Sequence, residues 1–487
     1  MSLHLAKALH KAFLALRKDL EADVRDWTAL SLSPASVHHE ATLAALGEEG
    51  CNKAIRQFAR YPGHNLNVLK ILQRKRVEFF DPLSGDAVIA TKSQVFRKYH
   101  FLFFTGPSGP GFLMCIGSRP QSIFYLTRKT WIDIRNHNDD HYAVLRQCLA
   151  TISRLNRTFY RYLSEPAGLE VACIVGDERP THFIRESLGG LQDYVDKDQI
   201  AVFWESIDYL IVPADNSFIL TDELFEVPSN VKVMYAGMND LNQIIAAKNL
   251  FTYRLMRSGS HMTDNLRERL TRYGDQASQA LNWPEVAKIK GGDDYRTVWF
   301  GVEIEKGRLK NQKDVFAAFL TTLKDRFGDK VRLIIDGWSP SPIFLTKKDE
   351  RIIASIRHFS RDVMKEIGIQ FEVIEAYSMS YRDKIKLAGE IDFFVTMHGS
   401  AAIVPSLIRQ KPGITYHSAW GMTIDHEVWT PTLYRTPTRE HTAQPGIRHW
   451  APFEVEIPAF RETLNRLIDD HHLTPTVIDA RLVAANG

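Results

Sequence analysis

The stretch with the clearest capacity for chemistry is residues 391–410. Its apolar run, residues 393–395, predicts a buried strand, His398-Gly399-Ser400 predicts a tight turn, and residues 401–408 predict a short apolar helix. Glycine lets a ligand approach the backbone, Ser400 can cap the helix, and the free N–H groups favour an anion. We therefore predict a phosphate site above the strand. The alternative is an ordinary turn of a parallel sheet that binds nothing.

A second candidate is the basic loop that follows the predicted strand 297–304. Lys306 and Arg308 lie beyond that strand's end, and the planar fork of arginine suits the oxygens of a diphosphate. Asn311 follows them and is a further candidate ligand residue. The alternatives are that Arg308 lies in a solvated loop and that Asn311 opens the following helix. We expect Lys306, Arg308 and Asn311 to contribute to a diphosphate-binding site.

A third group follows the predicted strand 371–375. Tyr377 and Ser380 come just after that strand and are candidates to contact a nucleotide base or ribose. Ser380 and Asp383 also have the spacing of a capping box, which accounts for both residues structurally. His398 has two interpretations as well: it satisfies a core carbonyl, or it donates to a phosphate as an imidazolium.

The candidate for proton transfer is the pair His182 and Glu186. If a helix opens near residue 181, these side chains are four apart and share one face near a strand end. Either residue is then a candidate general base. The alternative is that His182 caps or packs while Glu186 orients it or pairs with Arg179 or Arg185.

The elements that must position these residues alternate between strands and helices. The second half of the chain contains predicted strands at 297–304, 331–336, 371–375, 392–397 and 414–417, separated by predicted helices. The first half contains predicted strands at 169–175, 200–204, 210–212 and 231–235. Alternation of this kind predicts parallel sheets with helices on both faces. The first strand of the second half lacks a GxGxxG sequence, which disfavours a classical dinucleotide enzyme.

The length of 487 residues exceeds what one core usually fills. We predict an N-terminal helical extension over 1–82, an α/β domain over 83–285, a Rossmann-like domain over 286–450, and a C-terminal helix over 451–487 that returns to the first domain. The fold class is α/β, with two Rossmann-like, doubly wound domains that face a cleft.

Composition and charge exclude several classes. The net charge of +3 is too balanced to indicate a nucleic-acid partner. The four cysteines show no CxxC spacing, and no run is apolar enough for a membrane span, so we expect a cytoplasmic protein. Residues 3–20 form an amphipathic basic helix that either contacts an anionic membrane surface peripherally or packs on its own domain. No bound metal is expected, because the acidic pairs at 139–140 and 293–294 lack a DxD pattern at a strand end.

Taken in order, these motifs resemble one enzyme family. The series Arg308-x-x-Asn311, Ser380-x-x-Asp383-Lys384 and Asp392-x-x-Val395-x-x-His398-Gly399-Ser400 resembles the C-terminal domain of the family sixty-one glycosyltransferases. Upstream, His182-Phe183-x-x-Glu186-x-Leu188 resembles that family's His-Phe-x-x-(Glu/Asp)-x-Leu signature. The similarity covers about residues 169–425. The family's usual Glu-Gln pair is Asp383-Lys384 here, and its His-Gly-Ala is His398-Gly399-Ser400.

The resemblance implies a GT-B enzyme that moves a sugar from a nucleotide-sugar donor to a glycan acceptor, typically with inversion and without a metal or other cofactor. It makes 83–285 the acceptor-side domain and 286–450 the nucleotide-sugar-binding domain. The donor-binding residues are then Lys306, Arg308, Asn311, Tyr377, Ser380, Asp383, His398, Gly399 and Ser400. The resemblance also implies capsule or lipopolysaccharide synthesis as the setting. Two alternatives stay open: a nucleotide-sugar 2-epimerase, which also uses two Rossmann-like halves, and a non-catalytic scaffold that binds glycan or nucleotide.

Overall fold

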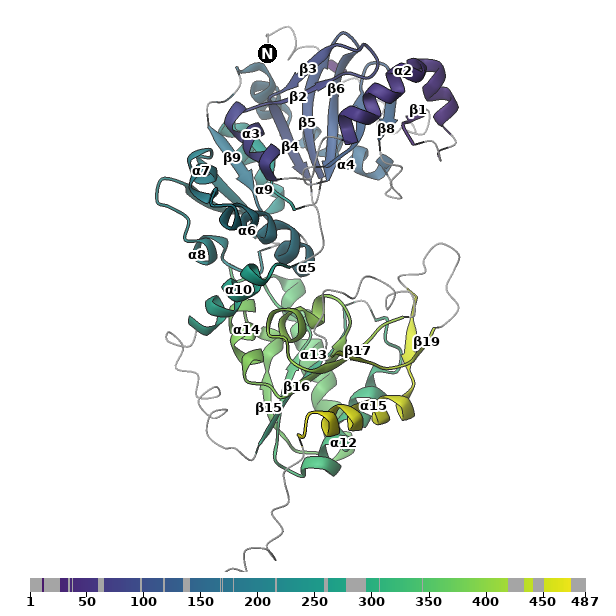
Figure 1. The fold of residues 1–487 in the computed structure, drawn as a ribbon, viewed down its shortest axis with the longest axis vertical. Coiled ribbons are helices and arrows are strands. Elements are labelled where there is room, and N and C mark those ends of the chain that lie inside the picture. The colour runs from purple at the N-terminus through teal and green to yellow at the C-terminus, as the bar shows by residue number, and fades with distance from the viewer. Residues whose placement is uncertain are drawn as a thin grey trace, which may run out of the picture. The chain divides into compact units, whose positions relative to one another are not determined.

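The computed structural model forms two compact units, Met1–Ser260 (unit 1) and His261–Gly487 (unit 2), whose elements are labelled in Figure 1. The structure describes residues 11–12, 27–33, 36, 38–59, 65–96, 99–116, 119–134, 141–166, 168, 170–177, 179–214, 217–257, 262–276, 295–305, 307–343, 345–418, 433–440 and 451–473. Among these residues, no helix combines the length and the apolar character that crossing a membrane requires.

Unit 1 begins with a six-stranded sheet. Its order is β1 (Thr28–Ser31), β8 (Thr130–Asp133), β7 (Arg119–Tyr125), β6 (Gly109–Ile116), β5 (Tyr99–Gly106) and β4 (Lys92–Phe96), antiparallel except for the parallel pair β1 and β8. Alternate aromatic residues of β5 and β6, such as Phe101, Phe103 and Phe112, bury one face in a core shared with α4 (His141–Ser164). The same unit includes α2 (His39–Ala59), α3 (Asn65–Arg74) and the hairpin of β2 (Val77–Phe80) and β3 (Ala87–Ala90).

Unit 1 continues with a parallel four-stranded sheet in the order β11 (Lys232–Ala236), β10 (Tyr209–Pro213), β9 (Val171–Ile174) and β12 (Phe251–Arg254). Its helices are α5 (Pro180–His182), η2 (Phe183–Leu188), α6 (Gly189–Asp196), α7 (Ile200–Glu205), α8 (Thr221–Phe225) and α9 (Met238–Ala247). The chain starts the sheet at β9, moves outward to β11, and returns to place β12 on the other side of β9. The strand order therefore reverses between β9 and β12.

The predicted strand at 200–204 is wrong, because these residues form helix α7. Their aromatic and β-branched composition favours a strand locally. In the fold, Phe203 stacks on Tyr194 with ring centroids 4.8 Å apart and contacts Trp204 edge-on at 5.0 Å. Burial of these aromatic rings against α6 outweighs the local preference.

Unit 2 has a parallel six-stranded sheet in the order β15 (Glu372–Glu375), β14 (Val331–Asp336), β13 (Arg296–Gly301), β16 (Phe393–Met397), β17 (Gly413–Tyr416) and β18 (Leu433–Arg435). One core joins this sheet to α12 (Gln312–Phe327) and α13 (Lys347–Ile367). Helix α14 (Tyr381–Gly389) packs instead with α10 (Asp264–Gln276) and η7 (Ile403–Ile408). The predicted Rossmann-like layout is confirmed for this unit, and its strand order reverses between β13 and β16.

The division of the chain differs from our prediction in three places. The C-terminal helix α15 (Ile457–Asp470) stays in unit 2, where its buried face, including Phe460 and Leu464, packs on α12. The boundary follows Ser260, not residue 285, because α10 packs on α14. Residues 28–31 and 77–80 are strands of unit 1 and not part of a helical extension. The stretch 3–20 lies outside the described residues except for Lys11 and Ala12.

Replacing Leu464 by alanine tests the assignment of α15 to unit 2. Leu464 is fully buried, and truncating such a side chain costs about 2–5 kcal/mol because it leaves a cavity. We expect faster amide hydrogen exchange in β17 and unchanged exchange in β9, measured by mass spectrometry on the full chain. The exposed neighbour Glu462→Ala is the control. Faster exchange confined to β9 would contradict the assignment.

Candidate functional site

The candidate donor site lies at the carboxyl edge of the unit 2 sheet, where the strand order reverses. Parallel strands end at the same edge, and ligands of such sheets bind outside that edge at the reversal. The Arg308 loop follows β13, and the turn His398–Ser400 follows the adjacent strand β16. The Tyr416 hydroxyl donates to the Gly301 carbonyl at 3.4 Å, and the His398 N–H donates to the Tyr416 carbonyl at 2.9 Å. The structure therefore brings the two predicted segments to neighbouring strand ends.

Two glycines shape this edge. A Cβ added at Gly301 would lie 2.0 Å from the Thr396 hydroxyl, so only glycine allows β13 and β16 to pair here. Gly399 has φ +107°, a conformation that other residues rarely adopt, and an added Cβ there would meet open space. The turn therefore presents its backbone toward a region that the described residues leave open.

The helix after the turn differs from the predicted one. Ser400 begins a 3₁₀ turn, Ser400–Ala402, with Gly399 at the N-cap position, and the chain continues as the π-helix η7. The predicted capping role of Ser400 is therefore wrong. Widened π-helical turns occur often at functional sites. A second π-helix, η2, contains Glu186 of the candidate proton-transfer pair, and His182 immediately precedes it.

The Arg308 loop is pinned to the C-terminal part of unit 2. Arg308 is buried, and its N–H donates to the Glu303 carboxylate at 3.0 Å. Its carbonyl accepts from the Phe453 N–H at 3.0 Å, and the Lys310 N–H donates to the Phe453 carbonyl at 2.9 Å. The interpretation as a solvated loop is therefore wrong. Lys306 lies outside the described residues.

Asn311 supports the same loop. Its side-chain amide donates to the Val455 carbonyl at 2.8 Å, and its side-chain oxygen accepts from the Val455 N–H at 3.0 Å. It stands at the N-cap position of α12 without making a side-chain cap. Both the nitrogen and the oxygen of the side-chain amide therefore bind the backbone of β20 (Phe453–Val455). The sequence did not indicate this role.

Tyr377, Ser380 and Asp383 lie together after β15. Ser380 caps α14, since its hydroxyl accepts from the Asp383 N–H at 3.2 Å and donates to the Asp383 carboxylate at 2.7 Å. Tyr377 is fully buried, with the Arg357 guanidinium 5.8 Å from its ring centre, and burial raises the pKa of Tyr377 to about 12. The phenol is therefore neutral at physiological pH.

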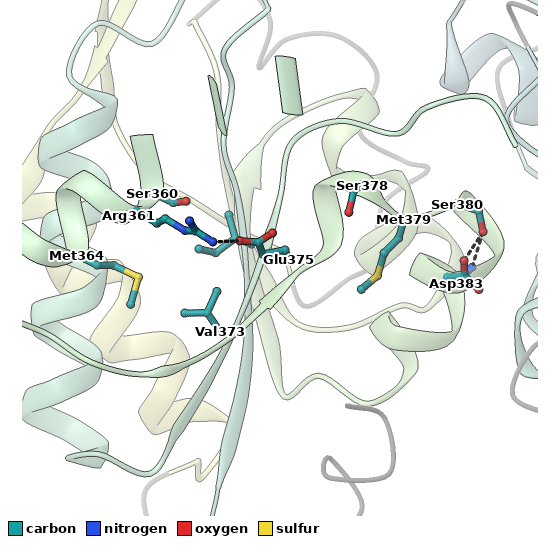
Figure 2. A pocket seen from close by; sticks show the side chains of 10 residues that line it. Ser360, Arg361, Met364, Val373, Glu375, Ser378, Met379, Ser380 and Asp383 are labelled. Atoms are coloured by element: carbon teal, nitrogen blue, oxygen red, sulfur yellow. Dashed lines mark hydrogen bonds and ion pairs between the residues drawn. The ribbon is translucent and has the colours of Figure 1, made fainter. Parts of the chain in front are cut away.

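A pocket of about 820 Å³ opens beside this segment. Figure 2 shows Ser380 and Asp383 on its wall together with Met379 and Ser378, and Arg361 paired to Glu375 at 3.1 Å. Apolar side chains alternate with hydroxyl and charged groups around it. A wall of this composition suits a flat ring with polar edges.

Lys384 makes buried contacts that the sequence did not predict. Its side chain is buried, and its ammonium donates to the Asp336 carboxylate at the end of β14, to the Trp338 carbonyl at 2.5 Å and to the Ser339 hydroxyl at 2.7 Å. Burial lowers the pKa of Lys384, while Asp336 opposes that shift. The lysine fixes the loop after β14 to α14. Lysine at position 384, where the family usually has glutamine, therefore adds an ion pair between α14 and the end of β14.

His417 is a second residue that we did not single out. It follows β17 directly, is buried, and stacks on Phe453 with ring centroids 5.8 Å apart. Its Nδ1 lies 3.0 Å from the Ser418 hydroxyl. Its position as the last residue of the predicted strand 414–417 was the available signal.

The candidate proton-transfer pair lies in unit 1 after β9. His182 Nδ1 lies 2.6 Å from Glu186 Oε1, and both side chains are partly exposed, at 43% and 22%. The hydrogen bond to Glu186 raises the pKa of His182, burial opposes this, and Asp177 adds to the rise while Arg179 reduces it. The predicted placement on one helical face is what the structure has. The carboxylate fixes Nδ1 and so orients the imidazole.

Among the described residues, no three His, Cys, Asp or Glu side chains are arranged to hold a metal ion. The acidic residues at 139–140 and 293–294, considered for a metal, lie outside the described part of the chain.

Comparison with known proteins identifies the family of this segment. Residues 177–405 match the family model described as Glycosyltransferase 61, and the predicted resemblance is confirmed over that range. A search of curated proteins found no match. Every candidate site residue falls inside the matched segment, which is a glycosyltransferase segment.

Solved structures give distant similarities. A putative UDP-N-acetylglucosamine 2-epimerase from Listeria monocytogenes aligns with TM-score 0.36 and 11% identity, over 62% of this chain and 88% of that one. The ADP-heptose lipopolysaccharide heptosyltransferase II of E. coli aligns with TM-score 0.30 and 11% identity, over 62% and 100%. A family 9 glycosyl transferase from Veillonella parvula aligns with TM-score 0.30 and 10% identity, over 55% and 86%.

Replacing Asn311 by alanine tests its structural role. The change leaves the Val455 N–H and carbonyl without their partners, so we expect a loss of about 1–3 kcal/mol in the free energy of unfolding without ligand. Asn311→Asp keeps the acceptor and should lose less, and the exposed neighbour Lys310→Ala is the control. Urea titration measures the effect. Unchanged stability with lost nucleotide binding would instead make Asn311 a ligand residue.

Proposed function

We propose that this chain, whose residues 177–405 match the glycosyltransferase 61 family, transfers a sugar from a nucleotide-sugar donor to a glycan acceptor with inversion and without a metal. The main supporting observation is that Arg308 and the His398–Ser400 turn follow adjacent strands at the reversal of strand order in unit 2. Parallel α/β sheets bind their ligands there.

The donor diphosphate contacts Arg308 and the open backbone of the His398–Ser400 turn. When the sugar leaves, negative charge develops on the nucleoside diphosphate, and positive groups fixed beforehand stabilise it. The anchoring of Arg308 by Glu303 and Phe453 supports this role, because a loop already held needs little rearrangement on binding. His398, when protonated, adds a donor to the phosphate.

The base and ribose of the donor contact residues 377–383. The pocket next to Ser380 and Asp383 supports this assignment, since its mixed apolar and polar wall accepts a planar heterocycle. The capping hydrogen bonds hold Ser380 and Asp383 in place. Tyr377 contributes by packing, because its ring is buried.

His182 acts as the general base, with Glu186 as its orienting partner. Its Nε2 removes the proton from the acceptor hydroxyl while that oxygen forms a bond to the anomeric carbon, and the bond from that carbon to the diphosphate oxygen breaks on the opposite face. One displacement of this kind inverts the anomeric configuration.

We further propose a cytoplasmic enzyme of capsule or lipopolysaccharide synthesis, with no cofactor, no nucleic-acid partner, and peripheral membrane contact through residues 3–20. The family match and the basic composition of that stretch support the proposal.

Substitutions at the donor site test the proposal through nucleotide binding. Nucleoside diphosphates that bind the folded chain raise its melting temperature by mass action. In a panel of UDP, ADP, GDP, CDP and TDP, we expect one nucleotide to stabilise the protein, and Arg308→Met or His398→Asn to remove most of that shift.

The control for this experiment is Arg351→Met, an exposed arginine of α13. It should leave the nucleotide-dependent shift unchanged. If no nucleotide in the panel stabilises the wild-type chain, or if all three variants behave alike, the proposed donor site is wrong.

Substitutions at the base separate catalysis from donor binding. His182→Asn should lower kcat by about 10²–10⁴-fold, the usual contribution of a positioned base, and leave nucleotide stabilisation intact. Because Glu186 raises the pKa of His182, Glu186→Gln should move the acid limb of the pH–rate profile to lower pH. Release of nucleoside diphosphate in the presence of glycan acceptors measures both effects.

The matched control is His358→Asn, which removes an exposed His–Asp pair of the same spacing, His358 to Asp362 at 3.0 Å in α13. It should not change the rate. An epimer formed from the donor alone would favour the 2-epimerase, and binding without any release of nucleoside diphosphate would favour the scaffold.

A further inference from the structure

A buried ion pair lies at the reversal of strand order in unit 1. Arg254, the last residue of β12, and Asp177, just after β9, have side chains only 1% and 8% exposed, with Nη2 and Oδ2 3.8 Å apart. The same guanidinium donates to the Gly176 carbonyl. Burying two charges is costly, and buried pairs are best explained when they fix one geometry.

His100 lies against this pair from the neighbouring sheet. It is fully buried on β5, and its ring meets Tyr253 edge-on at 5.3 Å. Burial and the charge of Arg254 lower the pKa of His100 to about 3, so its imidazole is neutral. Asp177 is thus the carboxylate that balances Arg254 at this place.

Asp177 connects the ion pair to the helix that carries His182. Its Oδ1 accepts from the Arg179 N–H at 3.1 Å, and Arg179 is the residue immediately before α5. The hydrogen bond fixes where the helix begins, three residues before His182. A shift of Asp177 would therefore move the start of that helix.

The segment after β12 also contacts Glu186, the second residue of the His182–Glu186 pair. The Arg257 N–H donates to the Glu186 carbonyl at 2.8 Å, and its guanidinium Nε lies 3.3 Å from the Asp193 carboxylate on α6. Residues 254–257 therefore contact the loop before α5 and, at Glu186, the π-helix η2. His182 lies between these two contacts along the chain.

We infer that the Arg254–Asp177 ion pair is a positioning device that holds the loop before α5, and with it the His182–Glu186 hydrogen bond, in the geometry needed for proton abstraction. This inference rests on the proposed role of His182 as the base. Arg254 and Asp177 do not touch substrate and act only through the helix.

The test follows the titration of the His182 imidazole by NMR in the full chain, labelled with ¹³C-histidine, with His182→Asn to assign the signal. Glu186, Asp177 and Arg179 are the charged groups that affect this imidazole. Arg254→Lys keeps the charge but removes the guanidinium group whose Nη2 contacts both Asp177 and the Gly176 carbonyl. We expect its His182 pKa to fall toward the 6.5 of an unperturbed imidazole, because the hydrogen bond to Glu186 weakens.

A double-mutant cycle separates positioning from a direct field effect. If Arg254 acts through the hydrogen bond, Arg254→Lys should change the His182 pKa in the wild-type background and have little further effect in a Glu186→Gln background. Equal shifts in both backgrounds would overturn the inference. Asp177→Asn offers a second variant should Arg254→Lys fold poorly. Because the charge of Asp177 itself raises the His182 pKa, only the part of its effect that disappears in the Glu186→Gln background supports positioning, and an equal fall in both backgrounds would overturn the inference.

Arg332→Lys is the matched control, since Arg332 is a buried arginine paired with Glu372 at 3.1 Å in unit 2. It should alter stability and leave the His182 titration unchanged. An unchanged titration in folded Arg254→Lys and Asp177→Asn would overturn the inference. The titration needs no donor, so the two hypotheses can fail separately. If the His182 pKa falls in Arg254→Lys while His182→Asn keeps full transfer activity, the proposed function is wrong.

Discussion

The pairing of β13 with β16 is the constraint on which the candidate donor site depends. These strands are far apart in sequence, yet they hydrogen-bond in parallel register from Val298 with Phe393 to Phe300 with Val395. Parallel pairing forces both to end at one edge, and the missing side chain at Gly301 lets the backbone of one approach Thr396 of the other. The loop of Arg308 and the turn at Gly399 consequently leave the sheet side by side. The sheet of unit 1 repeats the arrangement with β9 and β12, where His182 follows the first strand and Arg254 ends the second.

In each unit a buried ion pair holds a loop that follows a strand of the parallel sheet. In unit 2, Lys384 of α14 reaches Asp336 at the end of β14, and the two further acceptors of its ammonium belong to the following loop. In unit 1, Arg254 reaches Asp177 and the Gly176 carbonyl. An unpaired charge in such a place would be strongly destabilising, so each cation fixes its carboxylate and the loop that carries it. Both pairs join an element far along the chain to the segment just after a strand. The conformation of these loops is therefore tied to the fold of the whole unit.

Several side chains that look like ligand or cap residues in the sequence have other partners in the fold. The pattern at Asn311 is that of a helix start, but its side-chain amide binds the backbone of Val455. These residues are far apart in the sequence, so no local pattern predicts the contact. Ser400 was expected to cap a helix, but Gly399 occupies that position and the following turns are 3₁₀ and π. The predicted cap at Ser380 held, since its hydroxyl accepts from the Asp383 N–H, because such a cap is a local interaction between residues three apart. The same holds for His182 and Glu186, which are one helical turn apart.

The sequence by itself determined the alternation of strands and helices and the short-range pairs, because these depend on periodicity and on residues about one helical turn apart. It also carried the motifs whose resemblance the family match confirms for residues 177–405. Only the tertiary structure decided the order of strands, the packing of α15 on α12 within unit 2, the helical state of residues 200–205, and the partners of Arg254, Asn311 and Lys384. The physical reason is that burial and hydrogen bonding between distant segments set these features. A local pattern states which face of an element is apolar, but it does not state which other element covers that face.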